Sequence, residues 1–195
     1  MSDPRGPVTR RIEGQPIHDV VIPPPFDKAV IAHEHPEAEV GWLGDAIGVD
    51  LIVVRFVDGW ARPYAGDGKR NEDWFGWMHD VLAPGDCAVR HTQSSDSTNA
   101  PGSHSGGQAG RIVFERDAGV FIAYGHVQSI AVVQGQRVRA GDVVAKVGND
   151  GNSWHPHLHV GAWIDTAPLQ IRFDLAVRGR MLHEQGEAWC YGIAE

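Results

Sequence analysis

The chain has 195 residues, of which 42% are hydrophobic and 22% charged, and its formal net charge is −8 at pH 7. These values are typical of one ordinary globular domain and exclude a fibrous or disordered chain. The acidic balance also argues against nucleic acid as the partner, because phosphate binding needs clustered Lys and Arg side chains.

Residues 1–27 predict an extended segment ahead of the main domain. They are rich in Pro and Arg, and Pro23-Pro24-Pro25 offers no N–H groups to a β-ladder. The segment lacks the apolar run of a secretory signal, and no run in the chain approaches the ~20 apolar residues that span a membrane. We therefore expect a cytoplasmic location for the chain as given, with export only if the sequence is truncated.

Short β-type runs dominate residues 28–165, which we predict to be the main domain. The runs are rich in Val and Ile, and turns of Gly, Asp and Asn separate them. The expected strands are Ala29–Ala32, Val49–Val57, Asp80–His91, Arg111–Glu115, Gly119–His126, Ile130–Val133, Arg137–Val147 and His157–Trp163. This pattern predicts an all-β fold, either an antiparallel β-sandwich or a barrel.

Two long segments interrupt the expected strands. Asp58–Trp77 contains five aromatic side chains, and Thr92–Gly110 is rich in Ser, Gly and Asn. Both are long for hairpin loops, so they are candidate rims of a binding cleft. The aromatic cluster fits substrate binding and a cap on the core equally well. We expect residues 166–195 to form a C-terminal extension packed on the domain, in which Phe173–His183 could be a helix or a strand.

The strongest functional signal is His157-Leu158-His159. In a strand, residues two apart share a face, so the two imidazoles would lie side by side while Leu158 and Val160 enter the core. Imidazole is a common zinc ligand and titrates near neutral pH. One ring of such a pair can therefore bind an ion while the other handles protons.

Three further pieces precede this strand. Tyr124-Gly125-His126-Val127 places a third histidine at a strand end, Val133–Gly148 predicts a hairpin, a turn and a strand, and Gly148–Ser153 supplies a tight turn. In this order, the pieces resemble the lysostaphin-type (LytM-like) zinc endopeptidases with their "YxHL", "GQ.V..G" and "HLHfE" motifs. The resemblance implies an all-β fold of the duplicated hybrid motif type with long loops.

The resemblance also implies a role for each matching residue. His159 and Asp50 correspond to zinc ligands, and His126 and His157 correspond to the two catalytic histidines that hold the attacking water and stabilise the tetrahedral intermediate. The implied reaction is Zn²⁺-dependent hydrolysis of an amide bond in a peptide or a peptidoglycan-like substrate.

The sequence departs from the family at the remaining zinc ligand, a histidine four residues before the aspartate, where Ala46 stands. His35 could reach the ion through a longer loop, or Asp45 could ligate, giving a harder site. We expect His35 to be the third ligand. If the ligand set is incomplete, the alternative is a degenerate domain that binds a peptide or a partner protein without hydrolysing it.

Two smaller questions concern a lysine and the cysteines. The Val133–Gly148 hairpin also resembles biotinyl- and lipoyl-type carriers, but these present their lysine at a hairpin tip and Lys146 falls within an expected strand. Cys87 and Cys190 lack the CxxC spacing of a structural zinc site and are too few for a disulfide framework. We predict two unpaired thiols, with Cys87 half buried in a strand.

Overall fold

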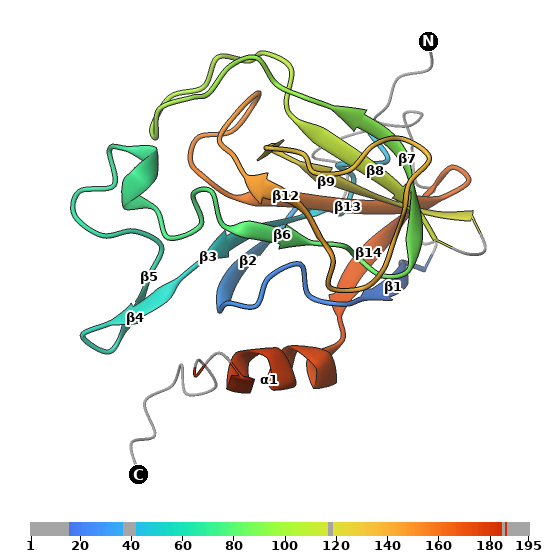
Figure 1. Ribbon diagram of the computed structural model, residues 1–195, viewed down its shortest axis with the longest axis horizontal. Helices are drawn as coiled ribbons and strands as arrows, with labels where there is room; N and C mark the ends of the chain where they lie inside the picture. The colour runs from blue at the N-terminus through green and yellow to red at the C-terminus, as the bar shows by residue number, and fades with distance from the viewer. Residues whose placement is uncertain (1–15, 37–41, 117–118, 185, 187–195) are drawn as a thin grey trace.

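The computed structural model describes residues 16–36, 42–116, 119–184 and 186 (Figure 1). These residues form an all-β structure with one short helix at its C-terminal end, which confirms the predicted fold class. The strands are β1 (His18–Ile22), β2 (Val30–Glu34), β3 (Val49–Val53), β4 (Arg55–Val57), β5 (Trp60–Arg62), β6 (Asp80–Leu82), β7 (Cys87–Gln93), β8 (Arg111–Glu115), β9 (Val120–Gly125), β10 (Val127–Gln128), β11 (Arg137–Val138), β12 (Val143–Val147), β13 (Leu158–Ile164) and β14 (Ala167–Phe173). A short 3-10 helix, Asn71–Asp73, and the α-helix α1, Leu175–Glu184, complete the elements.

Strand β13 is the centre of a nine-stranded sheet. The sheet follows the order β1-β14-β13-β9-β8-β7-β11, and β3 joins it through the first half of β13 and pairs in turn with β2. Strands β1 and β14 are parallel, whereas β13 is antiparallel to each of its three neighbours. A three-stranded sheet, β10-β12-β6, forms the second layer, and β4 and β5 form a separate hairpin.

The main hydrophobic core lies between the nine-stranded and three-stranded sheets. Val81, Val127 and Val144 from the smaller sheet belong to one buried cluster with Leu158 and Val160 of β13. Figure 1 shows β6 and β12 lying over β9 and β13. The prediction that Leu158 and Val160 enter the core is confirmed.

The opposite, outer face of the nine-stranded sheet has a smaller apolar cluster of Leu43, Val113, Ala123 and Trp163. Because neighbouring residues of a strand point to opposite faces, Asp50 and His159 belong to this outer face: their neighbours along the chain are in the core. The side chains of Asp50 and His159 therefore lie on the face of the sheet opposite to the main core.

Four expected strands differ from the structure: one is absent, and Val49–Val57, Asp80–His91 and Arg137–Val147 are each divided in two. Ile130–Val133 is not a strand, because this stretch makes a single backbone bond to β12, from the Ala131 N–H to the Val144 carbonyl. The expected strand Asp80–His91 is divided into β6 and β7 at Pro84-Gly85, where Gly85 has a φ of 142°. A proline has no N–H for the ladder, and that φ favours glycine, so the chain turns there.

Both chain ends contribute strands to the sheet. The segment expected to be only an extended lead-in contains β1, which ends at Ile22, immediately before the three prolines, and pairs along its whole length with β14. The segment Phe173–His183, for which the sequence allowed a helix or a strand, contains the last residue of β14 and most of α1. Asp174 caps that helix, since its side chain accepts hydrogen bonds from the Ala176 and Val177 N–H groups at 2.9 and 3.0 Å.

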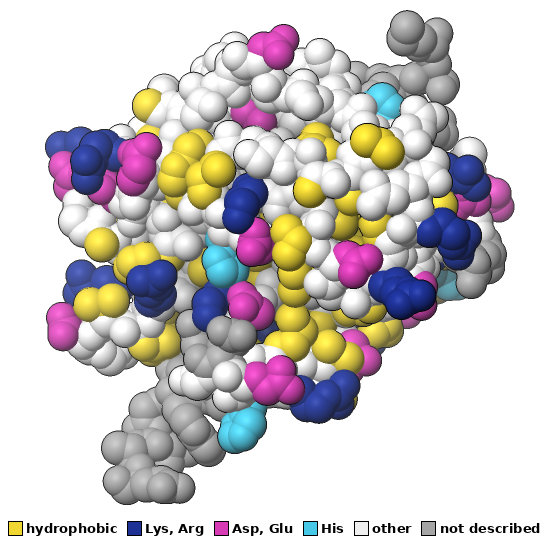
Figure 2. Space-filling model, in the orientation of Figure 1, with side chains coloured by type: hydrophobic (Ala, Val, Ile, Leu, Met, Phe, Trp, Pro, Cys, Tyr) yellow, Lys and Arg dark blue, Asp and Glu magenta, His cyan; other side chains and the backbone are white. Residues whose placement is uncertain are grey.

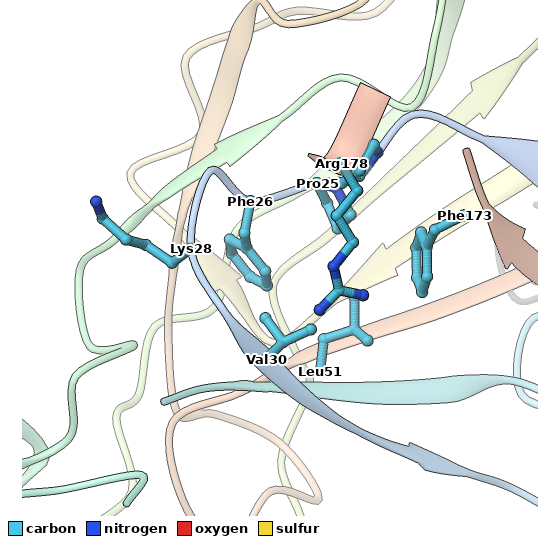
Figure 3. A pocket seen from close by; sticks show the side chains of 8 residues that line it. Pro25, Phe26, Lys28, Val30, Leu51, Phe173 and Arg178 are labelled. Carbon is cyan, nitrogen blue, oxygen red and sulfur yellow. The ribbon is translucent and has the colours of Figure 1, made fainter. Parts of the chain in front are cut away.

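A pocket lies beside α1, and Figure 3 shows Arg178 reaching into it from the helix. The lining consists of Pro24, Pro25, Phe26, Lys28, Val30, Leu51, Phe173 and Arg178. Leu51 belongs to the core and follows Asp50 on β3, so the two side chains point to opposite faces of the sheet. This pocket has no histidine or carboxylate in its lining and is separate from the outer face.

The surface charges are mixed in sign, and the described cysteine is more deeply buried than predicted. Figure 2 shows acidic and basic side chains interspersed over the face in view, without a stripe of one sign. Cys87 is a free thiol in β7, only 1% exposed, so its burial is complete and not half as predicted; Cys190 lies outside the described residues. None of the described segments forms a helix with the length and apolar character that a membrane span requires.

Candidate metal centre and histidine site

One row of directly opposed residues crosses four strands on the outer face. His33 of β2 pairs with Asp50 of β3, Asp50 pairs with His159 of β13, and His159 pairs with Gly125 of β9. Directly opposed residues of antiparallel strands share a face. The missing side chain at Gly125 makes room for the ring, because a Cβ there would lie 3.3 Å from the Cβ of His159. The sheet register alone therefore brings Asp50 and His159 together.

Asp50 lies between His159 and His35. Its Oδ1 is 2.9 Å from Nδ1 of His159, and its Oδ2 is 3.1 Å from Nε2 of His35. His35 continues the β2–β3 ladder by one bond, from its N–H to the Gly48 carbonyl at 2.8 Å, so its side chain shares a face with that of His33 two residues earlier. His35, the predicted third ligand, thus directly follows the adjacent strand β2.

His159 is held from behind by the chain that precedes β3. Its Nε2 is 2.8 Å from the Gly44 carbonyl and 3.2 Å from Oδ1 of Asp45. The Gly44 carbonyl approaches so closely because Gly161 has no side chain: a Cβ on Gly161 would lie 1.9 Å from that oxygen. Asp45 therefore contacts the ring nitrogen of His159 that points away from Asp50.

The carboxylates and the histidines of this cluster stabilise each other's charged forms. Burial by itself would raise the pKa of Asp50, but hydrogen bonds with His157, His159 and His35 outweigh it and hold that pKa far below its usual value. Asp45 follows the same pattern, because its hydrogen bond and attraction to His159 outweigh its burial and lower the pKa. Burial would lower the pKa of His159, yet Asp45 and Asp50 together raise it to about 10. The cluster strongly favours a positive charge beside Asp50.

A second geometric observation places His33 in the same cluster. One ligand atom from each of His33, His35 and Asp50 lies within 4.8 Å of the others. His33 is exposed, whereas His35 and Asp50 are partly buried. The place of His33 opposite Asp50 in the sheet explains why it lies so near.

His126 and His157 form a pair next to these donors. Their ring centroids are 4.6 Å apart, and Nε2 of His157 is 3.5 Å from Oδ2 of Asp50. His126 follows Gly125, so regular strand geometry would turn it to the core side. A positive φ of 58° turns its side chain back, and its Nδ1 bonds to the Asp150 carbonyl at 2.8 Å. Burial lowers the pKa of His126 and favours its neutral form.

The turn before β13 supports His157. Its Nδ1 is 2.8 Å from the His155 carbonyl and 3.2 Å from Oγ of Ser153. The ring of His155 stacks on Trp74 with centroids 4.5 Å apart and 8° between the planes. The aromatic segment Asp58–Trp77 therefore contacts the turn before β13 through Trp74.

The structure brings together all five side chains that sequence analysis selected, namely His35, Asp50, His126, His157 and His159. The roles that the resemblance implies for them stay predictions. Sequence analysis missed the supporting groups: the Gly44 carbonyl, Asp150 and Ser153. The turn from Gly148 to Ser153 was recognised only for its tolerance of positive φ, and nothing in its pattern indicates which of its polar groups would face a histidine.

Comparison with known proteins identifies the middle of the chain. Residues 78–171 match Peptidase family M23. The matched region includes His126, His157 and His159 and begins after Asp50 and His35. The family model therefore does not cover those two residues, and the distances above are what connect them to the three histidines.

Similar proteins and structures carry peptidase names. DD-carboxypeptidase/endopeptidase Mpg from Neisseria meningitidis and its counterpart from Neisseria gonorrhoeae are each 33% identical over 90 residues, 46% of this chain and 20% of theirs. The chain thus spans about a fifth of the length of these relatives. A putative peptidase M23 from Pseudomonas aeruginosa has a TM-score of 0.49 at 18% identity, covering 87% of this chain and 55% of that one. The catalytic domain of lysostaphin from Staphylococcus simulans has a TM-score of 0.45 at 19% identity, covering 70% and 81%. Residues 78–171 of this chain therefore match a Peptidase family M23 domain.

Proposed function

We propose that this domain is a zinc-dependent endopeptidase that hydrolyses an amide bond in a peptide or peptidoglycan-like substrate. The observation that carries the proposal is the position of Asp50. Its carboxylate lies 3.1 Å from His35, 2.9 Å from His159 and 3.5 Å from His157. A single carboxylate therefore joins the candidate ligand set to a candidate catalytic base.

The donor set suits zinc. Imidazole nitrogens and one carboxylate are common ligands of catalytic zinc, which keeps its fourth position for water. Tetrahedral ligands at ~2.05 Å from an ion are about 3.3 Å apart. The nitrogen-to-oxygen distances of 3.1 Å for His35 and 2.9 Å for His159 are within a few tenths of an ångström of that spacing. Small side-chain rotations would accommodate an ion.

The geometry favours His35 over Asp45 as the third ligand. Nε2 of His35 points at the same carboxylate group that His159 contacts through Nδ1. Asp45 contacts Nε2 of His159, the nitrogen on the far side of that ring. A group in that position orients a ligand and raises its basicity, and such partners often matter nearly as much as the ligands.

A zinc ion bound by these residues would supply a water of lowered pKa and a Lewis acid for the scissile carbonyl. His126 and His157 lie beside the donors and supply the proton-transfer groups. His126 is neutral at pH 7 because burial lowers its pKa, so it can accept a proton. Once protonated, either imidazole can stabilise an oxyanion nearby.

The substrate class rests on the family and on the loops. The Neisseria relatives are named DD-carboxypeptidase/endopeptidase, which supports a peptide substrate of the cell-wall kind. Two long segments, 58–77 and 94–110, flank the turn that precedes β13, and Trp74 of the first contacts His155. Loops of this kind carry specificity in many enzymes because a rigid sheet positions them.

The test combines metal analysis with peptide hydrolysis. The wild-type protein should hold about one zinc per chain and cleave a glycine-rich peptide or a cross-linked muropeptide. His35→Ala should lose most of the zinc, whereas the matched variant Asp45→Ala should keep the ion with lower affinity. His157→Ala should keep zinc and lose hydrolysis. Zinc binding by His35→Ala equal to that of wild type would reject His35 as a ligand.

One observation favours a second candidate function. Ala46 is buried and occupies the position of the family's usual zinc-ligand histidine, so the domain could bind a peptide without hydrolysing it. A protein that is metal-free after purification, and whose stability is indifferent to chelators, would support that binding function over hydrolysis.

A further inference from the structure

A cleft of about 320 Å³ opens beside the candidate metal centre. His35, the proposed third zinc ligand, is part of its lining, and Nε2 of His35 lies 3.1 Å from Oδ2 of Asp50. The volume is at the small end of the ~300–1,000 Å³ that ligand pockets usually have. A space of this size next to a metal centre suits a single side chain of a substrate, close to the bond that is cut.

The cleft arises from the way two strands share one edge of β13. Strand β9 pairs along the other edge, so β3, opposite residues 158–160, and β14, opposite residues 162–164, both lie along the same edge. The pairing of β14 with β13 ends at Leu169, whereas its pairing with β1 continues to Phe173. Strand β14 therefore diverges from β13 and leaves a gap between itself and the start of β3.

The walls of this gap are largely apolar. Val49 and Ile171, which belong to the main core, face each other across it, and Ile47 beside them is also buried. Ile17, which is 46% exposed, adds a fourth aliphatic side chain from the β1 side. Apolar lining of this kind favours the burial of a hydrocarbon stem by about 0.8 kcal/mol for each methylene group.

Glu34 gives the cleft a negative charge. It is the only acidic residue in the described lining, which contains no Lys or Arg. Within the described part of the chain, its carboxylate makes no ion pair. The half-buried Gln170 contributes an amide group on the β14 side. The chemistry that fits both the walls and this charge is an aliphatic stem that ends in an ammonium group, because such a side chain buries its methylenes and keeps its charge beside a carboxylate.

We propose that this cleft is a substrate subsite for the side chain of a lysine, or of another residue with an aliphatic stem and a terminal ammonium group, next to the scissile amide. Glu34 is then the specificity-determining residue. The inference rests on the proposed function, in which His35 binds the zinc ion at the edge of the cleft. An acidic substrate side chain is disfavoured there, because it would face Glu34 with no Lys or Arg in the described lining to offset the repulsion.

The first test measures binding without turnover. The full-length protein, as purified, is titrated calorimetrically with peptides Gly-Gly-Xaa-Gly-Gly in which a ketomethylene group replaces the amide on each side of Xaa. With Xaa as norleucine, which has the stem without the ammonium group, binding should be at least about tenfold tighter than with glycine, since several methylenes are buried. Lysine should bind up to about fivefold tighter than norleucine, the range of a partly exposed ion pair, and glutamate should bind more weakly than either.

The second test changes the charge of the cleft. Glu34→Gln should make the lysine and norleucine peptides bind equally, and Glu34→Lys should make the glutamate peptide bind more tightly than the lysine peptide. The matched control is Glu184→Gln, which removes an exposed carboxylate in α1 outside the cleft and should keep the preference for lysine. The preference of the wild type should also decrease at high salt, because salt screens the ion pair.

The third test locates the peptide. Ile17→Trp and Gln170→Trp fill the cleft from two positions on the β1–β14 side, and each should weaken binding of the norleucine and lysine peptides at least about tenfold by excluding the stem. Both residues lie outside the candidate donor set, so the zinc content and the melting temperature should stay close to those of wild type. Unchanged binding in a folded filling variant would place the peptide elsewhere and overturn the inference.

The outcomes separate this inference from the proposed function. Equal binding of the lysine and norleucine peptides by wild type, or a lysine preference that survives Glu34→Lys, would overturn the role of Glu34 whether or not the protein hydrolyses peptides. Hydrolysis that shows no preference for lysine beside the scissile amide would also reject the subsite while leaving the peptidase function in place. If the peptides bind as expected and their all-amide counterparts are not hydrolysed, the proposed function fails and the lysine-binding cleft remains.

Discussion

Replacing Gly161 with alanine tests how the outer face supports His159. A Cβ at residue 161 would lie 1.9 Å from the Gly44 carbonyl oxygen and 2.6 Å from its carbon. Carbon and oxygen that are not bonded approach to about 3.3 Å, so the Gly44 carbonyl would have to move by about 1.4 Å. The carbonyl oxygen and carbon of Gly44 both belong to the backbone, so no side-chain rotation can relieve their overlap with the added Cβ.

The expected cost has two parts. Overpacking of this kind costs about 1–3 kcal/mol. The displacement also breaks the 2.8 Å bond between the Gly44 carbonyl and Nε2 of His159, and a lost partner of a buried polar group costs about 1–3 kcal/mol more. The sum, about 2–6 kcal/mol, is a large part of the total stability of an ordinary domain, about 5–15 kcal/mol. Loss of such a supporting bond should also weaken zinc binding about 10–100-fold.

Urea unfolding and zinc competition with a chromophoric chelator measure the two effects of Gly161→Ala. Gly179→Ala is the matched control, because Gly179 lies exposed in α1, where an added Cβ would meet no atom of the described residues within 4 Å. That change should stabilise the protein by about 0.5–1 kcal/mol, since alanine has the higher helix propensity. A Gly161→Ala protein that is as stable as wild type and binds zinc as tightly would refute the reasoning.

Three further predictions concern the buried thiol of Cys87, the buried carboxylate of Asp150 and the proposed zinc ion. In a Cys190→Ser background, Cys87 should react with iodoacetamide at least about a hundredfold more slowly at pH 8 than a free thiol, because burial raises the pKa of its thiol from 9.0 to about 11 and the thiolate is the nucleophile. The neutral thiol contributes stability below pH 9.0 that is lost as the pH rises through about 11, so a reaction rate that increases steeply between those values checks the sign. Asp150→Ala should lower the free energy of unfolding by about 1–3 kcal/mol, because it removes the acceptor of the buried Gly110 N–H at 3.1 Å, and Asp150→Asn, which keeps an oxygen there, should cost less. Removal of zinc by a chelator should lower the unfolding free energy by about 4 kcal/mol relative to protein with free zinc at a thousandfold excess over its Kd, and an unchanged melting temperature would argue against a bound ion.

Much of the site could be predicted because it depends on strand periodicity. His157 and His159 share a face because they are two residues apart, and Leu158 enters the core for the same reason. The family resemblance selects Asp50, and the register of β3 against β13 then brings it to His159. Local pattern and family motif point to the same face of the sheet.

Other features depend on contacts that no local pattern encodes. The preference for His35 over Asp45 rests on contacts of the folded chain: His35 contacts the Asp50 carboxylate, which also contacts Nδ1 of His159, whereas Asp45 contacts Nε2 of His159. The side chain of His126 reaches the site only because its φ is 58°, which strand parity does not predict. The run Ile130–Val133 is as rich in β-branched residues as a true strand, but it makes one ladder bond. Its sequence favours a strand and the tertiary structure does not provide the partner.

The row from His33 to Gly125 also has a consequence for the order of folding. Asp50 and His159 are 109 residues apart in the chain, and they meet only when β3 has docked on β13 in the correct register. A shift by one residue would turn Asp50 toward the core, so a misregistered sheet has no complete donor set. An ion held by these residues would thus bind after this long-range pairing and would retard unfolding more than it accelerates refolding.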